Sequence, residues 1–306
     1  MNKVWVTGDA VVDLIPHKGG QSYLKCPGGA PANVAVGIAR LGGDTSFVGN
    51  VGNDPFGRFI AQILEAECVE TKFLAFNEAY RTSTVVVDLD HEGERTFTFM
   101  VTPSADQFFD AADKPDFAEN QWLHSCSIAL ANDPSRTATF NMMTRLKSQG
   151  GYISFDPNLR EQVWNSVEEM VENVSKAVEL ADIVKFSEEE LLLLSGKNSV
   201  DEALATPGWE DKAIIITLGS KGALVQYQGT QTIVPSKAVT KVVDTTGAGD
   251  AFVAGLLALL SRHSEWKNQE TIIAAVKCGN KCGALAVTKK GAMTALPTPE
   301  SLDVLS

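Results

Sequence analysis

The sequence predicts an α/β fold with a largely parallel central sheet, and two observations lead to this prediction. Short runs rich in β-branched and aromatic residues alternate with longer segments of helical periodicity over most of the 306 residues. Apolar residues make up 44% of the chain, which is enough for the core of one large domain or two smaller ones. Strands and helices that alternate in this way are typical of βα units around a parallel sheet.

The expected elements follow from these runs in chain order. The strands are expected at Lys3–Thr7, Thr45–Val51, Tyr152–Phe155, Ile183–Phe186 and Ala213–Leu218. The helices are expected at Ala32–Leu41, Phe56–Ala66, Arg136–Gln149, Val167–Leu180, Ser187–Leu194 and Ala251–Leu260. Ser187 followed by Glu190 has the spacing of a capping box, which marks the start of its helix.

Two segments interrupt the alternation early in the chain and predict antiparallel ribbon. Thr82–Leu89 and Arg95–Val101 have strand patterning around the turn His91–Gly93, and Asp13–Lys25 is rich in turn formers. We expect them to form a small sheet over a cleft, made by about residues 12–27 and 74–105, within a single domain over 1–306.

A further hairpin is expected at the edge of the main sheet. Ala223–Gln228 and Gln231–Val234 flank a turn at Gly229, the spacing of two paired strands.

Charge and cysteine content exclude several function classes. The chain carries 38 acidic and 26 basic residues, a net charge of −12, which argues against nucleic-acid and anionic-membrane partners. A bound nucleotide would need local backbone N–H groups, a few basic side chains and a divalent metal. The five cysteines are odd in number, and no apolar run is long enough for a signal peptide or membrane span. These features favour a reducing cytoplasm.

The segment Asp244–Phe252 combines two glycines with an acid, Asp250, at the start of an apolar run. Glycines before a helix let backbone N–H groups converge, and the positive end of the helix dipole favours an anion such as a phosphate. A carboxylate repels such a ligand, so an acid is expected beside a phosphate only where it has to accept a proton. The segment therefore suggests phosphoryl transfer. A capped glycine turn explains the same residues and stays open at this point.

Polar residues follow several expected strands, where ligands of open α/β sheets bind. Asp9 and Asp13 follow the first strand, and Asp156–Arg160, Lys185 and Gly219–Gly222 follow later ones. The loop Cys26–Asn33, with two prolines and two glycines, also exposes backbone donors before a helix. The P-loop, dinucleotide and G-x-S-x-G motifs are absent, and the four histidines lack ligand spacing.

Two long motifs resemble the signatures of the ribokinase-like (PfkB) carbohydrate kinases. They are Gly28–Gly43 with Val48–Gly57, and Asp244–Phe252, in the same order and separation. The resemblance covers essentially the whole chain. It implies a three-layer α/β/α sandwich with a mostly parallel sheet and a small β lid. Within the family, Phe155–Arg160 resembles the branch of fructokinases and 2-keto-3-deoxygluconate kinases, and bacterial fructokinases most of all.

The resemblance implies a role for each matching position in the phosphorylation of D-fructose by ATP and Mg²⁺. Asp250 would be the general base, and the N–H groups of Gly247, Ala248 and Gly249 would form the anion hole. The sugar would be held by Asp9, Asp13, Gly28, Gly29, Asn33, Phe97, Phe99, Arg160 and Asp250. The nucleotide would be bound by Lys185, Thr217, Gly219, Gly222, Ala248, Gly249 and Asn280.

The resemblance also implies two metal sites, and the chain departs from the family motif at one of them. Glu188 matches the acid that orders waters on Mg²⁺, but the asparagine three residues before it in the family motif is Lys185 here. A lysine at this position would reach a phosphate directly. Many relatives also bind K⁺ at positions that match Asp244, Thr246, Ala286 and Gly291.

Two alternatives stay open, and so does assembly. A 2-keto-3-deoxygluconate kinase shares the Arg160 segment, although its charged substrate needs more cationic or tyrosine partners than Phe97 and Phe99 provide. A sensor that binds sugar or nucleotide without turnover is the other alternative, and the intact Asp250 argues against it. Relatives also often pair through the lid sheet, which implies a homodimer.

Overall fold

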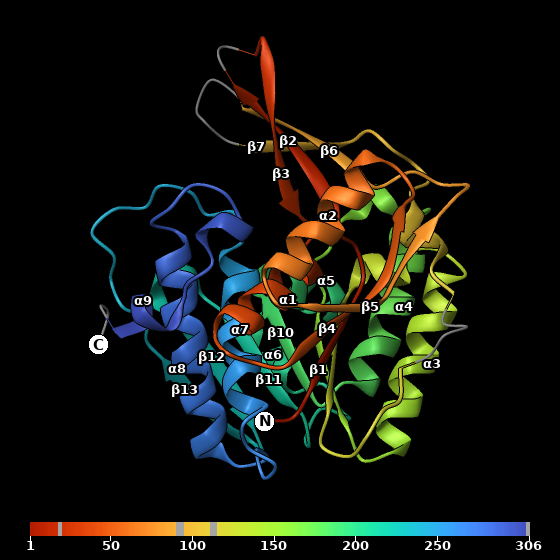
Figure 1. The fold of residues 1–306 in the computed structure, drawn as a ribbon. Helices are drawn as coiled ribbons and strands as arrows, with labels where there is room; N and C mark the ends of the chain where they lie inside the picture. Colours follow the sequence, from red (N-terminus) through yellow and green to blue (C-terminus); the bar gives the residue numbers. More distant parts are fainter. Residues whose placement is uncertain (18–19, 90–94, 111–114, 304–306) are drawn as a thin grey trace.

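The chain forms two β-sheets, a large one flanked by helices and a small one that projects beyond it (Figure 1). The computed structural model describes residues 1–17, 20–89, 95–110 and 115–303. Within these ranges, none of the helices has the length and apolar character needed to cross a bilayer.

The large sheet has nine described strands in the order β13-β12-β11-β10-β9-β8-β1-β4-β5. Seven of them run parallel, and the hairpin β12–β13 closes one edge in the antiparallel sense. The strand bounds are β1 Val4–Thr7, β4 Thr45–Gly52, β5 Glu70–Asn77, β8 Trp122–Cys126, β9 Tyr152–Asp156, β10 Ile183–Ser187, β11 Ala213–Thr217, β12 Ala223–Tyr227 and β13 Thr230–Val234.

Helices cover both faces of this sheet. One apolar core lies under α1 (Ala30–Arg40), α2 (Pro55–Ala66), α7 (Ala248–Leu260) and α8 (Gln269–Ala286), with α9 (Pro299–Asp303) beside it. The other lies under α3 (Ser135–Ser148), α4 (Val167–Leu180), α5 (Glu188–Ser195) and α6 (Val200–Leu204). Two cores on opposite faces of one sheet make a three-layer α/β/α sandwich.

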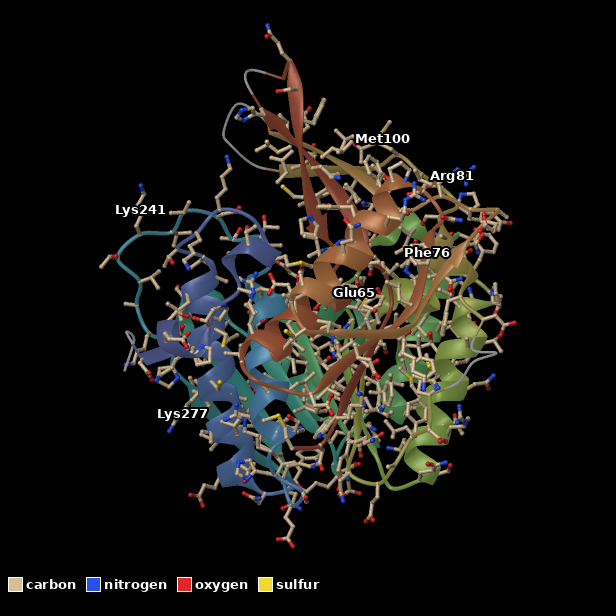
Figure 2. The ribbon with its side chains drawn as sticks, in the orientation of Figure 1. Glu65, Phe76, Arg81, Met100, Lys241 and Lys277 are labelled. Carbon is tan, nitrogen blue, oxygen red and sulfur yellow. The ribbon has the colours of Figure 1, made fainter. Side chains whose placement is uncertain are left out.

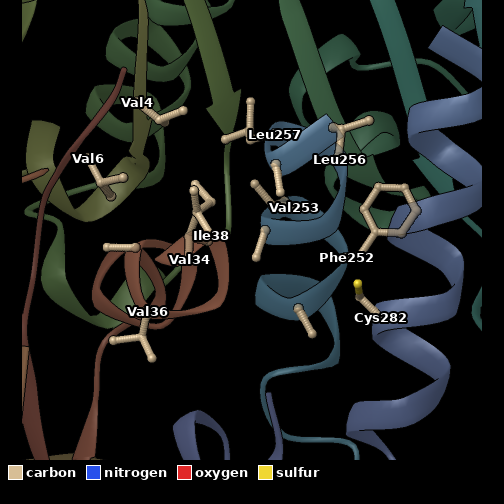
Figure 3. Close-up of a cluster of buried hydrophobic side chains, with 14 of the residues drawn as sticks. Val4, Val6, Val34, Val36, Ile38, Phe252, Val253, Leu256, Leu257 and Cys282 are labelled. Atoms are coloured by element: carbon tan, nitrogen blue, oxygen red, sulfur yellow. The ribbon is translucent and has the colours of Figure 1, made fainter. Parts of the chain in front are cut away.

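Helices α1 and α7 pack unusually closely, and Figure 3 shows Val34 and Ile38 of α1 beside Val253 and Leu257 of α7. Gly37 allows this approach, because a Cβ atom there would lie 2.5 Å from the Cβ of Ala254. The contact lies one helical turn after Asn33 in α1 and one turn after Asp250 in α7. The same packing therefore brings the first turns of both helices together.

The small sheet has the strand order β3-β2-β6-β7. It consists of β2 (Val11–His17), β3 (Ser22–Gly28), β6 (Thr84–Leu89) and β7 (Arg95–Phe99), with β2 and β6 parallel and the other pairs antiparallel. We call these four strands the lid sheet. The expected lid segment 74–105 begins too early, because residues 74–77 belong to β5 and pair with β4 in the large sheet. The turn His91–Gly93 lies outside the described residues.

Most expected elements are confirmed to within two residues, including the capping box of Ser187 and Glu190. The helix expected at Ala251 begins three residues earlier, at Ala248, so Asp250 lies inside its first turn. Two strands of the large sheet, β5 and β8, were not expected. Half of the residues of the edge strand β5 are polar and half are exposed, and the buried strand β8 contains His124 and Ser125, which interrupt its apolar run.

Candidate active site

A cavity lies between the carboxyl ends of the parallel strands, the first turns of α1 and α7, and the lid sheet. It encloses about 880 Å³, including its open mouth. Its lining residues are Asp9, Val11, Asp13, Gly29, Ala30, Asn33, Val85, Phe97, Phe99, Ile128, Asp156, Asn158, Arg160, Lys185, Thr246, Gly247, Gly249, Asp250 and Ala292. The structure thus collects many of the expected site residues on one surface.

The glycine turn before α7 has the geometry of an anion-binding site. Gly247 is the N-cap residue, with φ of 76°, and no side chain caps the helix. The N–H of Ala248 donates to the carbonyl of Thr245. Among the described residues, no protein acceptor is hydrogen-bonded to the N–H groups of Gly247 and Gly249. Free donors at a helix N-terminus suit a phosphoryl group, so the residues present fit the anion hole.

Asp250 lies in the first turn of α7 and faces the same cavity. The Nδ2 atom of Asn33 donates to its Oδ2 atom at 2.8 Å. Burial raises the pKa of Asp250, whereas the Asn33 hydrogen bond and the positive charges of Lys185 and Arg160 act to lower it. A carboxylate held in this way is oriented as a proton acceptor.

Lys185, near the end of β10, pairs with the buried carboxylate of Asp156 at the end of β9. Its Nζ atom lies 3.0 Å from Oδ1 and 3.1 Å from Oδ2. Burial is the largest effect on the pKa of Lys185 and acts to lower it, but the carboxylates of Asp156, Glu190 and Asp250 together outweigh it, so the pKa is raised. A Cβ atom on Gly249 would lie 3.6 Å from Nζ, so a fixed positive charge stands beside the anion hole.

The sugar side of the cavity contains a carboxylate that is almost fully buried. Asp9 is 5% exposed, and burial together with the charge of Asp106 raises its pKa to about 7. The thiol of Cys126 approaches its Oδ1 atom at 3.7 Å. Gly29, with φ of 95°, lies so close to the Asp9 carbonyl that a Cβ atom would be 2.6 Å away.

The remaining expected sugar residues surround this carboxylate. Phe97 and Phe99 reach the cavity from strand β7 of the lid sheet, and Arg160 reaches it from the loop after β9. Asp13 also lines the cavity, and Gly28 leaves the room that its carboxylate occupies.

The expected nucleotide residues other than Lys185 and Gly249 do not line this cavity. Thr217 ends β11 and donates from Oγ1 to the Phe186 carbonyl at 3.2 Å, and Gly219 and Gly222 form the next turn. Asn280 is buried in α8, where its Nδ2 atom donates to the Val234 carbonyl at 2.9 Å. The structure shows a packing contact for Asn280, and its nucleotide role stays a prediction.

The residues expected around metal ions lie at two places. Glu188 is the exposed first residue of α5 and does not line the cavity. Asp244 joins the two segments expected at the K⁺ site, because its carboxylate accepts from the N–H of Thr246 at 3.1 Å and of Gly291 at 2.7 Å. Ala286 ends α8 just before this second segment.

The side chains also limit how Mg²⁺ can be held. No group of three or more His, Cys, Asp or Glu side chains in the described ranges has the arrangement of a metal site. In phosphotransferases generally, Mg²⁺ keeps several waters and is held by one or two carboxylates together with substrate phosphates.

Seven lining residues received no role from the family resemblance: Val11, Ala30, Val85, Ile128, Asp156, Asn158 and Ala292. Asp156 ends strand β9 and Asn158 follows it, in the segment Asp156–Arg160 whose place after a strand had marked it as a candidate. Ile128 and Ala292 come from a short 3₁₀ helix and a loop, and no motif marks them.

Known proteins of one family match this chain over nearly its whole length. The chain matches the family described as pfkB family carbohydrate kinase over residues 1–299. Fructokinase of Vibrio alginolyticus is 56% identical over 303 residues, which cover 99% of this chain and 98% of that protein. Aminoimidazole riboside kinase of Salmonella typhimurium is 44% identical and covers 99% of this chain and 94% of its own length.

Solved structures show the same fold. Fructokinase from Vibrio cholerae O395, in its fructose-, ADP- and calcium-bound form, has a TM-score of 0.95 and 59% identity, and covers 100% of this chain and 99% of its own. Aminoimidazole riboside kinase from Salmonella enterica, complexed with aminoimidazole riboside and an ATP analogue, has a TM-score of 0.91 and 42% identity at 99% coverage of both chains. The ribokinase-like sandwich is thereby confirmed, and the chain belongs to the pfkB family of carbohydrate kinases.

Proposed function

We propose that this kinase transfers the γ-phosphoryl group of ATP to the 6-hydroxyl of D-fructose. The observation that carries the proposal is the position of Asp250, a carboxylate in one cavity with a glycine turn whose N–H groups are free to bind an anion. The fructokinase relatives, one of them solved with fructose and ADP, support fructose and ATP as the substrates.

In the proposed reaction Asp250 accepts the proton of the sugar hydroxyl while the hydroxyl oxygen attacks the γ-phosphorus. The bond to the oxygen that bridges the β- and γ-phosphorus atoms breaks, and ADP leaves with that oxygen. The free N–H groups of Gly247 and Gly249 would hold the charge of the transferring group, together with the N–H of Ala248, which is shared with the Thr245 carbonyl, and Lys185 stands beside them. Mg²⁺, when bound, would neutralise phosphate charge, with Glu188 ordering its waters.

The sugar contacts are proposed from the lining of the cavity. Asp9, Asp13, Asn33 and the backbone at Gly28 and Gly29 would bind hydroxyls, Phe97 and Phe99 would cover the apolar face of the ring, and Arg160 would lie beside it. In this proposal the chain acts as one domain, residues 1–306, whose lid sheet closes the cavity and excludes water.

The nucleotide and cation contacts are proposed from the family resemblance. Thr217, Gly219, Gly222 and Asn280 would surround the nucleotide, as the family resemblance implies. The turn joined by Asp244 would hold K⁺ with Thr246, Ala286 and Gly291 around it. A K⁺-bound fructokinase from Vibrio cholerae O395 supports this last proposal.

We also propose a cytoplasmic location and a homodimer. None of the five cysteines forms a disulfide in the part of the chain that the structure describes, and such thiols suit a reducing compartment. The lid sheet exposes apolar side chains at Tyr23 and Leu24, and a second lid sheet would cover them.

A coupled ADP-release assay tests the function. Wild-type enzyme is assayed with fructose, 2-keto-3-deoxygluconate, aminoimidazole riboside, ribose, glucose and adenosine, with and without K⁺. We expect the highest kcat/KM for fructose. Turnover with none of these compounds above background ATPase would favour the sensor alternative.

Asp250→Asn tests the role of the base in the same assay. A positioned base contributes about 10²–10⁴ in rate, so we expect this variant to fold, to bind ATP and to lose turnover by that factor. Near-normal kcat in Asp250→Asn would contradict the mechanism.

A further inference from the structure

Asn33 and Asp250 form a direct contact between two helices that are far apart in the sequence. The Nδ2 atom of Asn33 lies 2.8 Å from Oδ2 of Asp250, and each residue is in the first turn of its helix, α1 or α7. One turn further on, Gly37 and Ala254 bring the same two helices into close contact. The distance between the two side chains is therefore set by helix packing.

The other end of the Asn33 amide has no partner in the described protein. Asn33 is 3% exposed and lines the cavity, and its Oδ1 atom is buried without a hydrogen bond. An ionised carboxylate offers only acceptors, so the amide must direct its NH₂ group toward Asp250. Because the amide is planar, Oδ1 is then fixed as an acceptor. A buried acceptor without a partner is costly, and a ligand hydroxyl would relieve that cost.

We propose that Asn33 is a positioning residue for the base: its NH₂ group holds one oxygen of Asp250 so that the other takes the proton, and its Oδ1 atom accepts from a second hydroxyl of the same sugar. One side chain then links recognition of the sugar to orientation of the base. The inference rests on the proposed function, because it assumes that Asp250 accepts a sugar proton. It requires a substrate with a hydroxyl close to the one that is phosphorylated.

The contact has an electrostatic consequence that can be measured. The charged groups around Asp250 are Lys185 on β10, Asp156 at the end of β9, Arg160 in the following loop and Asp9 after β1. The hydrogen bond from Asn33 acts with Lys185 and Arg160 to lower the pKa of Asp250 against burial. Loss of this hydrogen bond alone would raise the pKa of Asp250 and leave the other charges in place.

The test compares Asn33→Ala and Asn33→Asp with the wild type in pH profiles of kcat for fructose. We expect the acidic limb to move to higher pH, by about one unit in Asn33→Ala and further in Asn33→Asp, where a second carboxylate faces the first. At any pH on the acidic limb, kcat of Asn33→Ala should then be about tenfold below that of the wild type. If only KM for fructose rises and the limb stays in place, Asn33 is a sugar ligand and the inference is wrong.

Asn158→Gly is the matched control. Asn158 also lines the cavity, has φ of 40° that glycine tolerates, and makes no hydrogen bond to Asp250 among the described contacts. Its substitution should change KM for fructose without moving the acidic limb of kcat.

A second readout does not depend on turnover. A raised folded-state pKa makes an acid lose stability as pH rises from its unfolded value, near 4, through the folded value. The Tm of ligand-free Asn33→Ala should therefore fall more steeply between pH 5 and pH 8 than that of the wild type. Parallel Tm curves would overturn the inference. Absence of fructose turnover in the wild type would instead overturn the proposed function. The Tm curves would still show whether the hydrogen bond from Asn33 lowers the pKa of Asp250.

Discussion

At the scale of single residues, the buried carboxylate of Asp9 lowers the stability of the folded protein at neutral and higher pH. The carboxylate is buried, its pKa is raised to about 7, and burial and Asp106 are the main causes. The folded protein therefore binds a proton at Asp9 between about pH 4 and pH 7 that the unfolded chain does not bind. As pH rises through this window the stability contributed by that proton is lost. Such unfavourable burial is typical of residues selected for binding.

We predict that Asp9→Asn makes the ligand-free protein more stable above pH 7 and impairs sugar binding. At pH 8 its Tm should exceed that of the wild type by about 3 °C or more, because the neutral amide at position 9 removes the cost of burying an ionised carboxylate there. The KM for fructose should rise at least tenfold. Differential scanning fluorimetry at pH 5 is the internal control, since Asp9 is protonated there and the two Tm values should converge. A constant Tm difference across pH would refute this explanation.

At the scale of elements, the start of α7 depends on contact with a neighbouring loop. Gly247 has φ of 76°, and a Cβ atom there would lie 2.8 Å from the Cα atom of Ala292. Ala292 lines the same cavity and follows Gly291, whose N–H is bonded to Asp244. The glycine is thus required both by its backbone conformation and by the packing of the loop against the turn.

We predict that Gly247→Ala lowers kcat by about 10²-fold or more and destabilises the protein by more than the cost of backbone strain alone. Gly42→Ala is the control, because Gly42 has nearly the same φ, 77°, with no atom within 4 Å of its Cβ position. The control should lose about 1 kcal/mol of stability and keep its kcat. Urea unfolding and the ADP-release assay measure the two effects. Equal losses of kcat and of unfolding free energy in Gly247→Ala and Gly42→Ala would show that backbone strain explains both effects and that the contact with Ala292 contributes nothing.

At the scale of the whole molecule, the two sheets differ in how they are covered. The large sheet has helices on both faces, whereas the lid sheet projects beyond the body of the molecule (Figure 1). Leu24 on its edge strand β3 is 49% exposed. Met100, which is labelled in Figure 2, lies just after the other edge strand β7 and is 62% exposed. An exposed edge with apolar side chains favours pairing with another sheet.

We predict a dimer through the lid sheet that Leu24→Glu disrupts. Light scattering should give the wild type about twice the 32.8 kDa mass of the chain, and Leu24→Glu should approach the monomer mass. Ile233→Glu is the matched control, because Ile233 is 64% exposed on β13, at the edge of the large sheet. It should leave the mass unchanged. A monomeric wild type at micromolar concentration would contradict the proposed assembly.

Local patterns account for the parts of this protein that the sequence predicts well. The alternation of strand and helix periods predicts the sandwich, and polar residues after strands predict the edge at which the cavity lies. Strand β8 was not predicted because His124 and Ser125 are polar, although their neighbours bury them. The positions of Ile128 and Ala292 in the cavity were not predicted because only the folding of the chain brings them there.

The sequence by itself determined the α/β class, the glycine turn before α7 and the acid that follows it, because each depends on residues close together in the chain. Only the tertiary structure decided which partners these residues have. The structure pairs Asn33 with Asp250 across 217 positions and Lys185 with Asp156 across 29, and both pairings depend on helix packing and strand order. Contacts between such distant positions leave no local pattern, because burial and charge act on side chains only after the chain has folded around them.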